Sequence, residues 1–532
     1  MATIENPILT GFNPDPSICR VGEDYYIAVS TFEWFPGVGI YHSKDLKHWN
    51  LVSRPLNRVS QLDMKGNPNS GGVWALALSY ADGQFWLIYT DVKVTNGQWK
   101  DCHNYLVTSE TIDGDWSEPS HLNSSGFDPS LFHDEDGKSI LLTMVWDHRQ
   151  PNHAFHGIVM QEFDAEQRKL VGKKEIIFKG TDVKLTEAPH LYKINGFYYL
   201  LTAEGGTRFE HQATIARAEN IWGPYTVHPS NPLISLTQLR EIRYKKLDTR
   251  RLCRRTQMNG FLFTLDVRCP ETINLFIYQE AFAHDEKPPF SGNGRKTGHT
   301  LSGGNEPSLS IEGPAIAEVS WDQPPEKDDF SDTELRLDYQ TLRIPLDKNI
   351  GNTTDHSGHL RLYGKESLTS LFTQAFVARR WQHFRFQAET KLAFRPDSFQ
   401  QAAGLVNYYN TENWTALQIT WDEQKGRILQ LSACDNGTYS EPRLAEVMTV
   451  LESTEYVYMR VNVDVQTYRY SYSFDGTTWN ELDVSFDSYK LSDDYIRGGG
   501  FFTGAFVGMQ CQDTSGENLH ADFDYFSYKS HA

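Results

Sequence analysis

The sequence lacks the features that mark several other classes of protein. Its six cysteines include no CxxC pair, so they indicate neither a zinc site nor a disulfide framework. Lys and Arg total 50 against 69 Asp and Glu, and the net charge of -19 argues against nucleic acid or an anionic membrane as a partner. No apolar run approaches the roughly 20 residues of a membrane span, and no basic and apolar leader opens the sequence. A cytoplasmic location and a neutral substrate are therefore expected.

Aromatic residues, by contrast, are abundant. They make up 13% of the 532 residues, with 26 Tyr, 30 Phe and 13 Trp. Such side chains favour β-structure and offer flat apolar faces on which sugar rings can stack. The length also exceeds what a single hydrophobic core supports, so at least two domains are expected.

An internal repeat organises the first half of the chain. Four segments each read as a hairpin with alternating apolar residues around a Gly-containing turn. They are NPDPSICRVGEDYYIAV from Asn13, GVWALALSYADGQFWLIYT from Gly72, GFDPSLFHDEDGKSILLTM from Gly126 and TEAPHLYKINGFYYLLTA from Thr186. The equivalent leading positions are Asp15, Trp74, Asp128 and Glu187, spaced by 59, 54 and 59 residues.

A period of this length is typical of a β-propeller blade, and radial repetition places the first strand of each blade beside the central axis. Equivalent positions should then converge. The repeat therefore predicts that Asp15, Asp128 and Glu187 point into one axial depression, although each of them taken alone could be an ordinary turn residue.

The pattern changes at a polar, Pro-rich stretch around residues 321–330. Beyond it, short alternating segments such as FRFQAETKLAF, TALQITWD and YVYMRVNVD indicate an antiparallel sandwich. We therefore predict an all-β protein, with a β-propeller over residues 1–320 and a β-sandwich over residues 326–532.

Paired carboxylates suit the cleavage of a glycosidic bond, which needs one acid to protonate the leaving oxygen and a second carboxylate on the other face of the sugar. Glu187 has apolar neighbours that would raise its pKa and let it hold a proton. Asp15 lies on a Pro-flanked loop where a water can be activated, and Asp128 would keep Glu187 protonated by like-charge repulsion.

The segments GFNPDPSI, GGVWA, SSGFDPSLF, LTEAPHLY and TAEGGTRFE together resemble family 43 glycoside hydrolases, specifically the β-xylosidase branch. The resemblance implies an all-β fold of a five-bladed β-propeller followed by a concanavalin-like β-sandwich, and an inverting mechanism. It assigns the general base to Asp15, the general acid to Glu187 and an orienting, modulating role to Asp128.

The resemblance also implies a blind pocket for one sugar. Its lining residues would be Phe32, Trp74, Phe127 and Thr207, with Phe506 reaching across from the sandwich to close it. Trp74, Phe127 and Phe506 could instead be ordinary core aromatics. The expected activity is exo-acting release of xylose from the non-reducing end of β-1,4-xylo-oligosaccharides, with α-L-arabinofuranosidase side activity.

Residues 236–303 depart from this pattern. Between Arg240 and Arg255 the chain carries eight Lys or Arg against two acids, and the family's Gly-His-Ala and Gly-Arg-Pro segments are missing. Back-translation in a shifted frame restores segments that resemble them, in the correct order. We therefore predict that this stretch is translated out of frame; the alternative is a divergent fifth blade, because Asn259–Leu265 echoes Asn195–Leu201.

A truly disrupted fifth blade would favour a different class of function, namely a non-catalytic or impaired carbohydrate-binding protein. No cofactor is expected to be required. The resemblance allows a divalent cation such as calcium in the central cavity, although its expected His is among the missing segments. It also favours a homo-oligomer built through the sandwich domains.

Overall fold

The computed structural model describes residues 8–206, 211–229, 231–232, 234–235, 261–269, 272–279, 298–302, 307–310, 319, 321, 324–442, 448–450, 452–493, 495–496 and 502–531. Over these residues the protein is built from strands, with one 3₁₀ turn, η1 (Ser488–Leu491). None of the helical structure described is long and apolar enough to cross a membrane. The prediction of an all-β fold is confirmed.

Five antiparallel sheets form the first half of the chain, and each follows the sequence order of its strands. Blade 1 contains β1 (Ser17–Val21), β2 (Asp24–Val29), β4 (Gly39–Ser43) and β5 (Asn50–Ser53); blade 2 contains β6 (Gly72–Ala81), β7 (Gln84–Val92), β8 (Cys102–Ser109) and β9 (Ser120–Asn123). Blade 3 contains β10 (Ser130–His133), β11 (Ser139–Trp146), β12 (Phe155–Asp164) and β13 (Lys169–Phe178). Blade 4 contains β14 (Glu187–Ile194), β15 (Phe197–Glu204), β16 (Gln212–Ala218), β17 (Thr226–Val227) and β18 (Ile234–Ser235); blade 5 contains β19 (Phe261–Cys269), β20 (Thr272–Gln279), β21 (Gly298–Ser302) and β22 (Pro307–Ser310).

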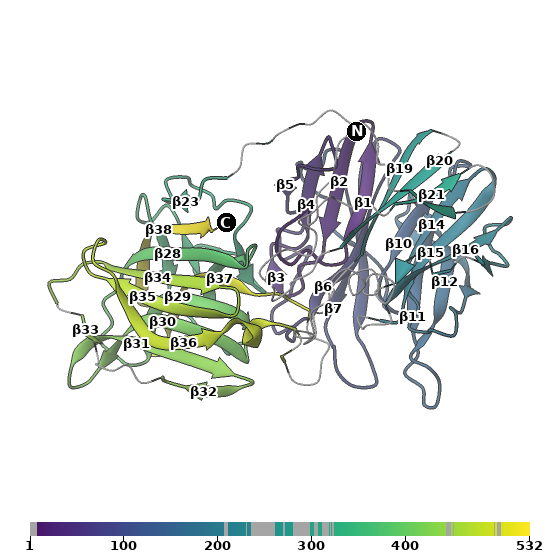
Figure 1. Cartoon of the computed structure of the whole chain (residues 1–532). Helices are drawn as coiled ribbons and strands as arrows, with labels where there is room; N and C mark the ends of the chain where they lie inside the picture. Colours follow the sequence, from purple (N-terminus) through teal and green to yellow (C-terminus); the bar gives the residue numbers. More distant parts are fainter. Residues whose placement is uncertain are drawn as a thin grey trace, which may run out of the picture.

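The first strands of the blades lie side by side. Strand β1 contacts β6 and β19, and β10 contacts β6 and β14, so the inner strands surround a common axis. Figure 1 shows the blades as a fan of sheets, with blade 5 returning to β1. The chain is therefore a five-bladed β-propeller followed by a sandwich, as the repeat predicted.

The hairpins that start the blades turn where the sequence predicted. Asp82 and Gly83 both have positive φ, 53° and 78°, and so do Asn195 and Gly196, 51° and 81°. Two successive residues of this kind form the tight turn whose twist matches that of the flanking strands. Register is thereby fixed, and apolar side chains of neighbouring blades pack against one another.

Two packed sheets form the second half of the chain. One contains β23 (Lys327–Asp328), β25 (Gly351–Asn352), β26 (Leu360–Tyr363), β28 (Arg385–Ala393), β34 (Val457–Asp464), β35 (Thr467–Ser473), β36 (Asn480–Asp487) and β38 (His520–Ser530). The other contains β3 (Trp34–Phe35), β24 (Gln340–Leu342), β27 (Ala375–Arg380), β29 (Gln401–Asn410), β30 (Asn413–Asp422), β31 (Gly426–Asp435), β32 (Thr438–Ser440), β33 (Met448–Thr449) and β37 (Phe506–Asp513). A large apolar core lies between them.

One strand of the second sheet comes from the propeller half of the chain. Strand β3 leaves blade 1 and pairs with β24, with Phe35 opposite Thr341 and Trp34 opposite Leu342. Figure 1 shows β3 at the boundary between the propeller and the sandwich. The two halves are thus joined by a shared sheet, which places loops of the sandwich next to the loop that precedes β3.

Candidate active site

The three predicted acids occupy equivalent places at the starts of inner strands. Asp15 and Asp128 each lie two residues before a strand, β1 and β10, and Glu187 is the first residue of β14. Asp15 and Asp128 share an unusual backbone conformation, with φ of 51° and 55°. Because a left-handed conformation is rare outside glycine, its repetition indicates that each loop turns its carboxyl in the same way relative to its blade.

The structure brings these carboxyls together. Asp128 Oδ2 accepts a hydrogen bond of 3.1 Å from the backbone N–H of Ala188, the residue after Glu187. Asp15 raises the pKa of Asp128, and both Asp128 and Asp15 raise the pKa of Glu187. Residues more than 50 positions apart in the sequence therefore act on one another as neighbours.

Burial is the main reason that all three pKa values lie above their usual range. It raises the pKa of Asp15 to about 6. The Asp128 and Glu187 carboxyls also lose hydration, and the like charges around them raise the pKa of each further. At neutral pH the site thus contains an ionised Asp15 and a Glu187 that keeps its proton, which is the pair that an acid–base reaction needs.

A group of aromatic side chains includes Phe127, the residue that precedes Asp128. Trp74, the leading residue of blade 2, meets Phe127 edge to face, with ring centroids 5.4 Å apart. Phe502 from the sandwich lies 6.3 Å from Trp74 and 6.2 Å from Phe32. These rings come from blade 1, blade 2, blade 3 and the sandwich, and they present the apolar faces that sugar rings favour.

Hydrogen bonds hold this aromatic group in place. The Trp74 indole N–H donates to the Ser70 carbonyl oxygen at 2.7 Å, while the Ser70 hydroxyl accepts from the backbone N–H of Phe502 at 2.8 Å. Ser70 therefore connects the propeller ring to the sandwich ring. The Nζ of Lys100 lies 5.2 Å from the Trp74 centroid and adds a cation over its face.

The prediction that Phe506 closes the pocket is wrong. Its side chain is fully buried and stacks on Trp34, with centroids 3.5 Å apart and an interplanar angle of 11°. Since Phe506 belongs to β37, it faces the core between that strand and β3. Phe502, four residues earlier and still partly exposed, is the sandwich residue that reaches the other aromatics. The GGGFFTGAF segment contained the signal, but alternation within a strand could not choose between its phenylalanines.

Of the other four predicted lining residues, three lie within the described part of the chain. Phe32, Trp74 and Phe127 lie in one aromatic group together with Phe502. Thr207 lies outside the described residues. Sequence reasoning missed Phe502, Ser70 and Lys100, because a single polar residue in a loop carries no periodic signal.

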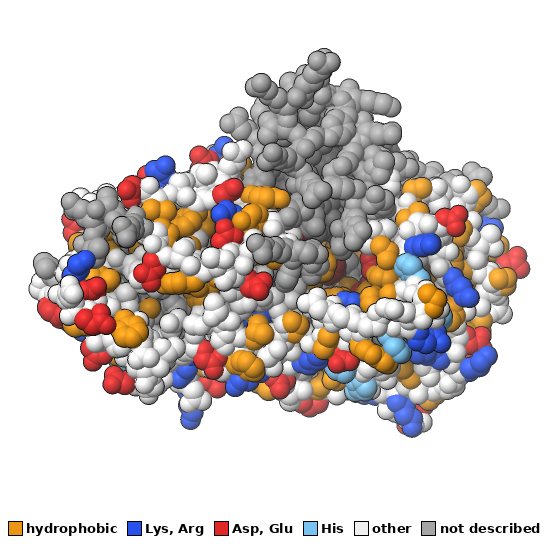
Figure 2. Space-filling view, turned by 90° about the horizontal axis from the view of Figure 1, so that it is seen from below, with side chains coloured by type: hydrophobic (Ala, Val, Ile, Leu, Met, Phe, Trp, Pro, Cys, Tyr) orange, Lys and Arg blue, Asp and Glu red, His pale blue; other side chains and the backbone are white. Residues whose placement is uncertain are grey.

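The described residues contain no group of three or more His, Cys, Asp and Glu placed to hold a metal ion. The histidine expected to serve a cation belongs to the Gly-His-Ala segment that this sequence lacks. Surface charge is also mixed: on the described part of the face in Figure 2, acidic and basic side chains alternate with no extended basic area.

A propeller whose axis holds three dehydrated, mutually repelling carboxyls among aromatic rings defines a glycoside hydrolase. The sequence profile described as "Glycosyl hydrolases family 43" matches residues 4–248, and that of the "Beta xylosidase C-terminal Concanavalin A-like domain" matches residues 327–529. The chain is 58% identical to a β-xylosidase of Bacillus subtilis (strain 168), with 99% of each chain covered. It therefore belongs to glycosyl hydrolase family 43.

Two further relatives extend the comparison. A "Xylosidase/arabinosidase 43B" of Humicola insolens is 43% identical, with 99% of this chain and 98% of the relative covered. The crystal structure of a xylan β-1,4-xylosidase from Bacillus halodurans C-125 superposes with a TM-score of 0.89 at 46% identity, covering 99% of this chain and 100% of that one. The similarity thus extends over both halves of the chain.

Proposed function

We propose that the protein is an exo-acting, inverting β-xylosidase that removes single xylose units from the non-reducing ends of short β-1,4-xylo-oligosaccharides. The observation that carries the proposal is the pair of carboxyls with separated pKa values. Asp15 has a pKa of about 6, while the Glu187 carboxyl, beside Asp128, keeps its proton far above the usual range. The β-xylosidases to which the chain is similar over its whole length support the choice of sugar.

In the proposed reaction Asp15 accepts a proton from a water molecule as the water oxygen attacks the anomeric carbon. The bond to the leaving oxygen breaks, and the Glu187 proton passes to that oxygen. Asp128 acts on Glu187 more strongly than Asp15 does. The weaker effect of Asp15 on Glu187 fits an inverting mechanism. In that mechanism a water molecule lies between the base and the sugar, and the acid lies on the other side of the sugar.

The test is hydrolysis of xylobiose followed by proton NMR, together with release of p-nitrophenol from its β-xyloside. Inversion predicts that α-xylose appears first and then mutarotates. Initial formation of β-xylose would contradict the proposal. The Glu187→Ala variant is the control for background hydrolysis of xylobiose.

A non-catalytic carbohydrate-binding protein is the second candidate. The observation that favours it is the missing Gly-His-Ala and Gly-Arg-Pro segments within 236–303. Xylose binding by the purified wild-type chain, without turnover of either substrate, would establish this reading and reject the first.

The arabinofuranosidase side activity rests on the similarity to a relative named for both activities. Both sugars are pentoses and present similar hydroxyl groups to a pocket. Measuring kcat/KM for the p-nitrophenyl β-xyloside and α-L-arabinofuranoside on the same preparation tests it, and a ratio above one is expected.

We also propose that residues 236–303 are encoded out of frame within a gene for a complete propeller. The family 43 profile stops at residue 248 and the C-terminal profile starts at 327, so neither covers the segment between. Strands β19–β22 stand in the position of blade 5, as the alternative of a divergent fifth blade predicts. Sequencing the gene across this region decides, and one uninterrupted frame in closely related strains would reject the frame error.

Three remaining expectations concern the protein's surroundings. We propose a cytoplasmic location and, from the resemblance to the family, a homo-oligomer assembled through the sandwich domains. We also keep a divalent cation as a candidate occupant of the central cavity. Fractionation, light scattering and assay after chelation test these inferences in turn.

A further inference from the structure

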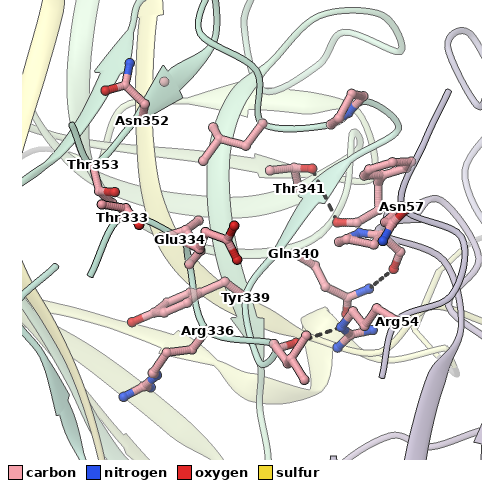
Figure 3. A pocket seen from close by; sticks show the side chains of 17 residues that line it. Arg54, Asn57, Thr333, Glu334, Arg336, Tyr339, Gln340, Thr341, Asn352 and Thr353 are labelled. Carbon is pink, nitrogen blue, oxygen red and sulfur yellow. Dashed lines mark hydrogen bonds between the residues drawn. The ribbon is translucent and has the colours of Figure 1, made fainter. Parts of the chain in front are cut away.

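A second cavity lies at the junction of the propeller and the sandwich, with a volume of about 320 Å³. Its propeller wall consists of Phe35, Pro36, Arg54 and Asn57, and residues 333–353 of the sandwich supply the rest. Figure 3 shows Arg54 and Asn57 beside the propeller ribbon and Glu334 on the side of the sandwich. None of the three candidate catalytic carboxyls, and none of the rings around them, lines this cavity.

Arg54 is the most unusual residue of the cavity wall. It is 9% exposed, and its Nε donates one hydrogen bond of 2.7 Å to the Leu337 carbonyl oxygen. Within the described part of the chain it makes no ion pair, and its terminal nitrogens have no hydrogen-bond partner. Burial lowers its pKa to about 10. A guanidinium has five donors, so most of them are left for a ligand in the cavity.

Glu334 lines the same cavity and is also without a partner among the described residues. Among the described residues it makes no ion pair with Arg54 or with Arg336, which also line the cavity. Arg336 is already engaged, since it donates hydrogen bonds of 3.2 and 3.0 Å to the two carboxyl oxygens of Asp338. The cavity wall therefore carries a buried guanidinium, on which Asp338 acts electrostatically, and a solvent-exposed carboxylate that makes no ion pair in the described part of the chain.

The rest of the wall is partly apolar and partly unsatisfied. Phe35, Leu335 and Leu346 give it hydrocarbon surface. Gln340 and Thr353, also in the wall, each carry a buried side-chain oxygen with no hydrogen-bond partner in the described part. The wall thus combines apolar surface with more polar groups than it satisfies by itself.

We propose that this junction cavity binds a small, neutral, polyhydroxylated compound of about the size of a pentose. A carboxylate only accepts hydrogen bonds and a guanidinium only donates them, whereas a hydroxyl group does both. A polyol can therefore serve Glu334 and Arg54 together, while its C–H faces pack on the apolar wall. An anion would meet the Glu334 charge and a cation would meet Arg54. The volume lies near the lower limit of roughly 300 Å³ for ligand sites.

The test is calorimetric titration of the full chain with D-xylose, compared between the wild type and the Glu334→Ala variant. The wild type should show one binding site more than the variant, because the variant's junction affinity falls roughly tenfold or more on loss of a charged hydrogen-bond acceptor. The matched control is Glu423→Ala, which removes an exposed carboxylate in the turn between β30 and β31. This control should keep the wild-type number of sites.

Further arms separate the possible ligands. Glycerol should compete for the junction site, whereas inorganic phosphate should not. Equal site numbers in the wild type and Glu334→Ala, or phosphate binding that Arg54→Lys abolishes, would overturn the proposal. Crystals soaked in D-xylose give an independent reading: a sugar between Arg54 and Glu334 supports it, and ordered water alone rejects it. These readouts record binding rather than hydrolysis, so they are independent of the proposed catalytic function.

Discussion

Three carboxyl groups that share one dehydrated axis cannot all be ionised at neutral pH, because each negative charge raises the cost of the next. Here Glu187, which both other acids act on, has a pKa well above the ordinary range, while the pKa of Asp15 is about 6. The difference between acid and base thus arises from position within the blade repeat, since the chemical groups are the same.

Replacing the two acids one at a time should have different consequences. We expect Glu187→Gln to lower kcat/KM by about 10²–10⁴-fold on xylobiose and by much less on p-nitrophenyl β-xyloside, whose leaving group departs without a proton. Asp15→Asn should impair both substrates to a similar degree, because the attacking water needs its base in either case. Steady-state kinetics on the two substrates measure the difference, and equal losses for Glu187→Gln would contradict its role as the acid.

The pH profile should have its acid limb near pH 6. Asp15 must be deprotonated to act as a base, and burial raises its pKa to about 6, so kcat/KM falls as the pH is lowered through this value. Glu187 must keep its proton, and burial together with the nearby Asp128 raises its pKa, so the alkaline limb lies well above the usual range of a glutamate. The profile of kcat/KM for p-nitrophenyl β-xyloside gives the acid limb, which should disappear from the residual activity of Asp15→Asn.

The segment that leads into β37 shows why periodicity identifies an element more readily than a function. Both Phe502 and Phe506 come from one aromatic stretch of the sequence. Phe506 is inside the strand and packs on Trp34, whereas Phe502 precedes the strand and reaches the aromatic group of the propeller. Where the strand begins decides the role of each ring, and strand ends are the least predictable part of an element.

The two phenylalanines provide a matched pair of substitutions. Phe502→Ala should raise KM for xylobiose several-fold and leave the free energy of unfolding nearly unchanged, since this ring is partly exposed. Phe506→Ala should instead lower the free energy of unfolding by about 3–5 kcal/mol, as removal of a fully buried ring does. Denaturant titration and steady-state kinetics on both variants test this, and the reversed pattern would restore Phe506 as the pocket residue.

A buried carboxyl and a buried guanidinium act on each other electrostatically at the boundary between the two domains. Glu33, next to Phe32, is fully buried, and burial raises the pKa of its carboxyl while Arg343 of the sandwich acts against this rise. Arg343 is 2% exposed and donates to the carbonyl oxygen of Asn67 at 2.7 Å and to Asn69 Oδ1 at 3.1 Å. The propeller loops near the site are therefore held by a residue that the sandwich supplies.

Replacing only one of these two residues should lower the free energy of unfolding disproportionately, because the other residue is then left without its partner. Arg343→Met leaves the Glu33 charge uncompensated, so the free energy of unfolding should fall by about 3–5 kcal/mol. The double variant Glu33→Gln with Arg343→Met should cost less than the sum of the two single changes. Denaturant titration of the four proteins measures the coupling, and strictly additive costs would show that the two charges do not interact.

The sequence by itself determined the strands, the blades and the identity of the three acids, because local alternation, turn residues and a repeat of 54 to 59 residues are properties of neighbouring positions. The equivalence of Asp15, Asp128 and Glu187 then implied their convergence. Only the tertiary structure decided that Phe502 rather than Phe506 meets the propeller aromatics, that Ser70 and Arg343 hold the loops, and that Arg54 and Glu334 share a cavity. These contacts join residues hundreds of positions apart, and their energies depend on burial, which no local pattern encodes.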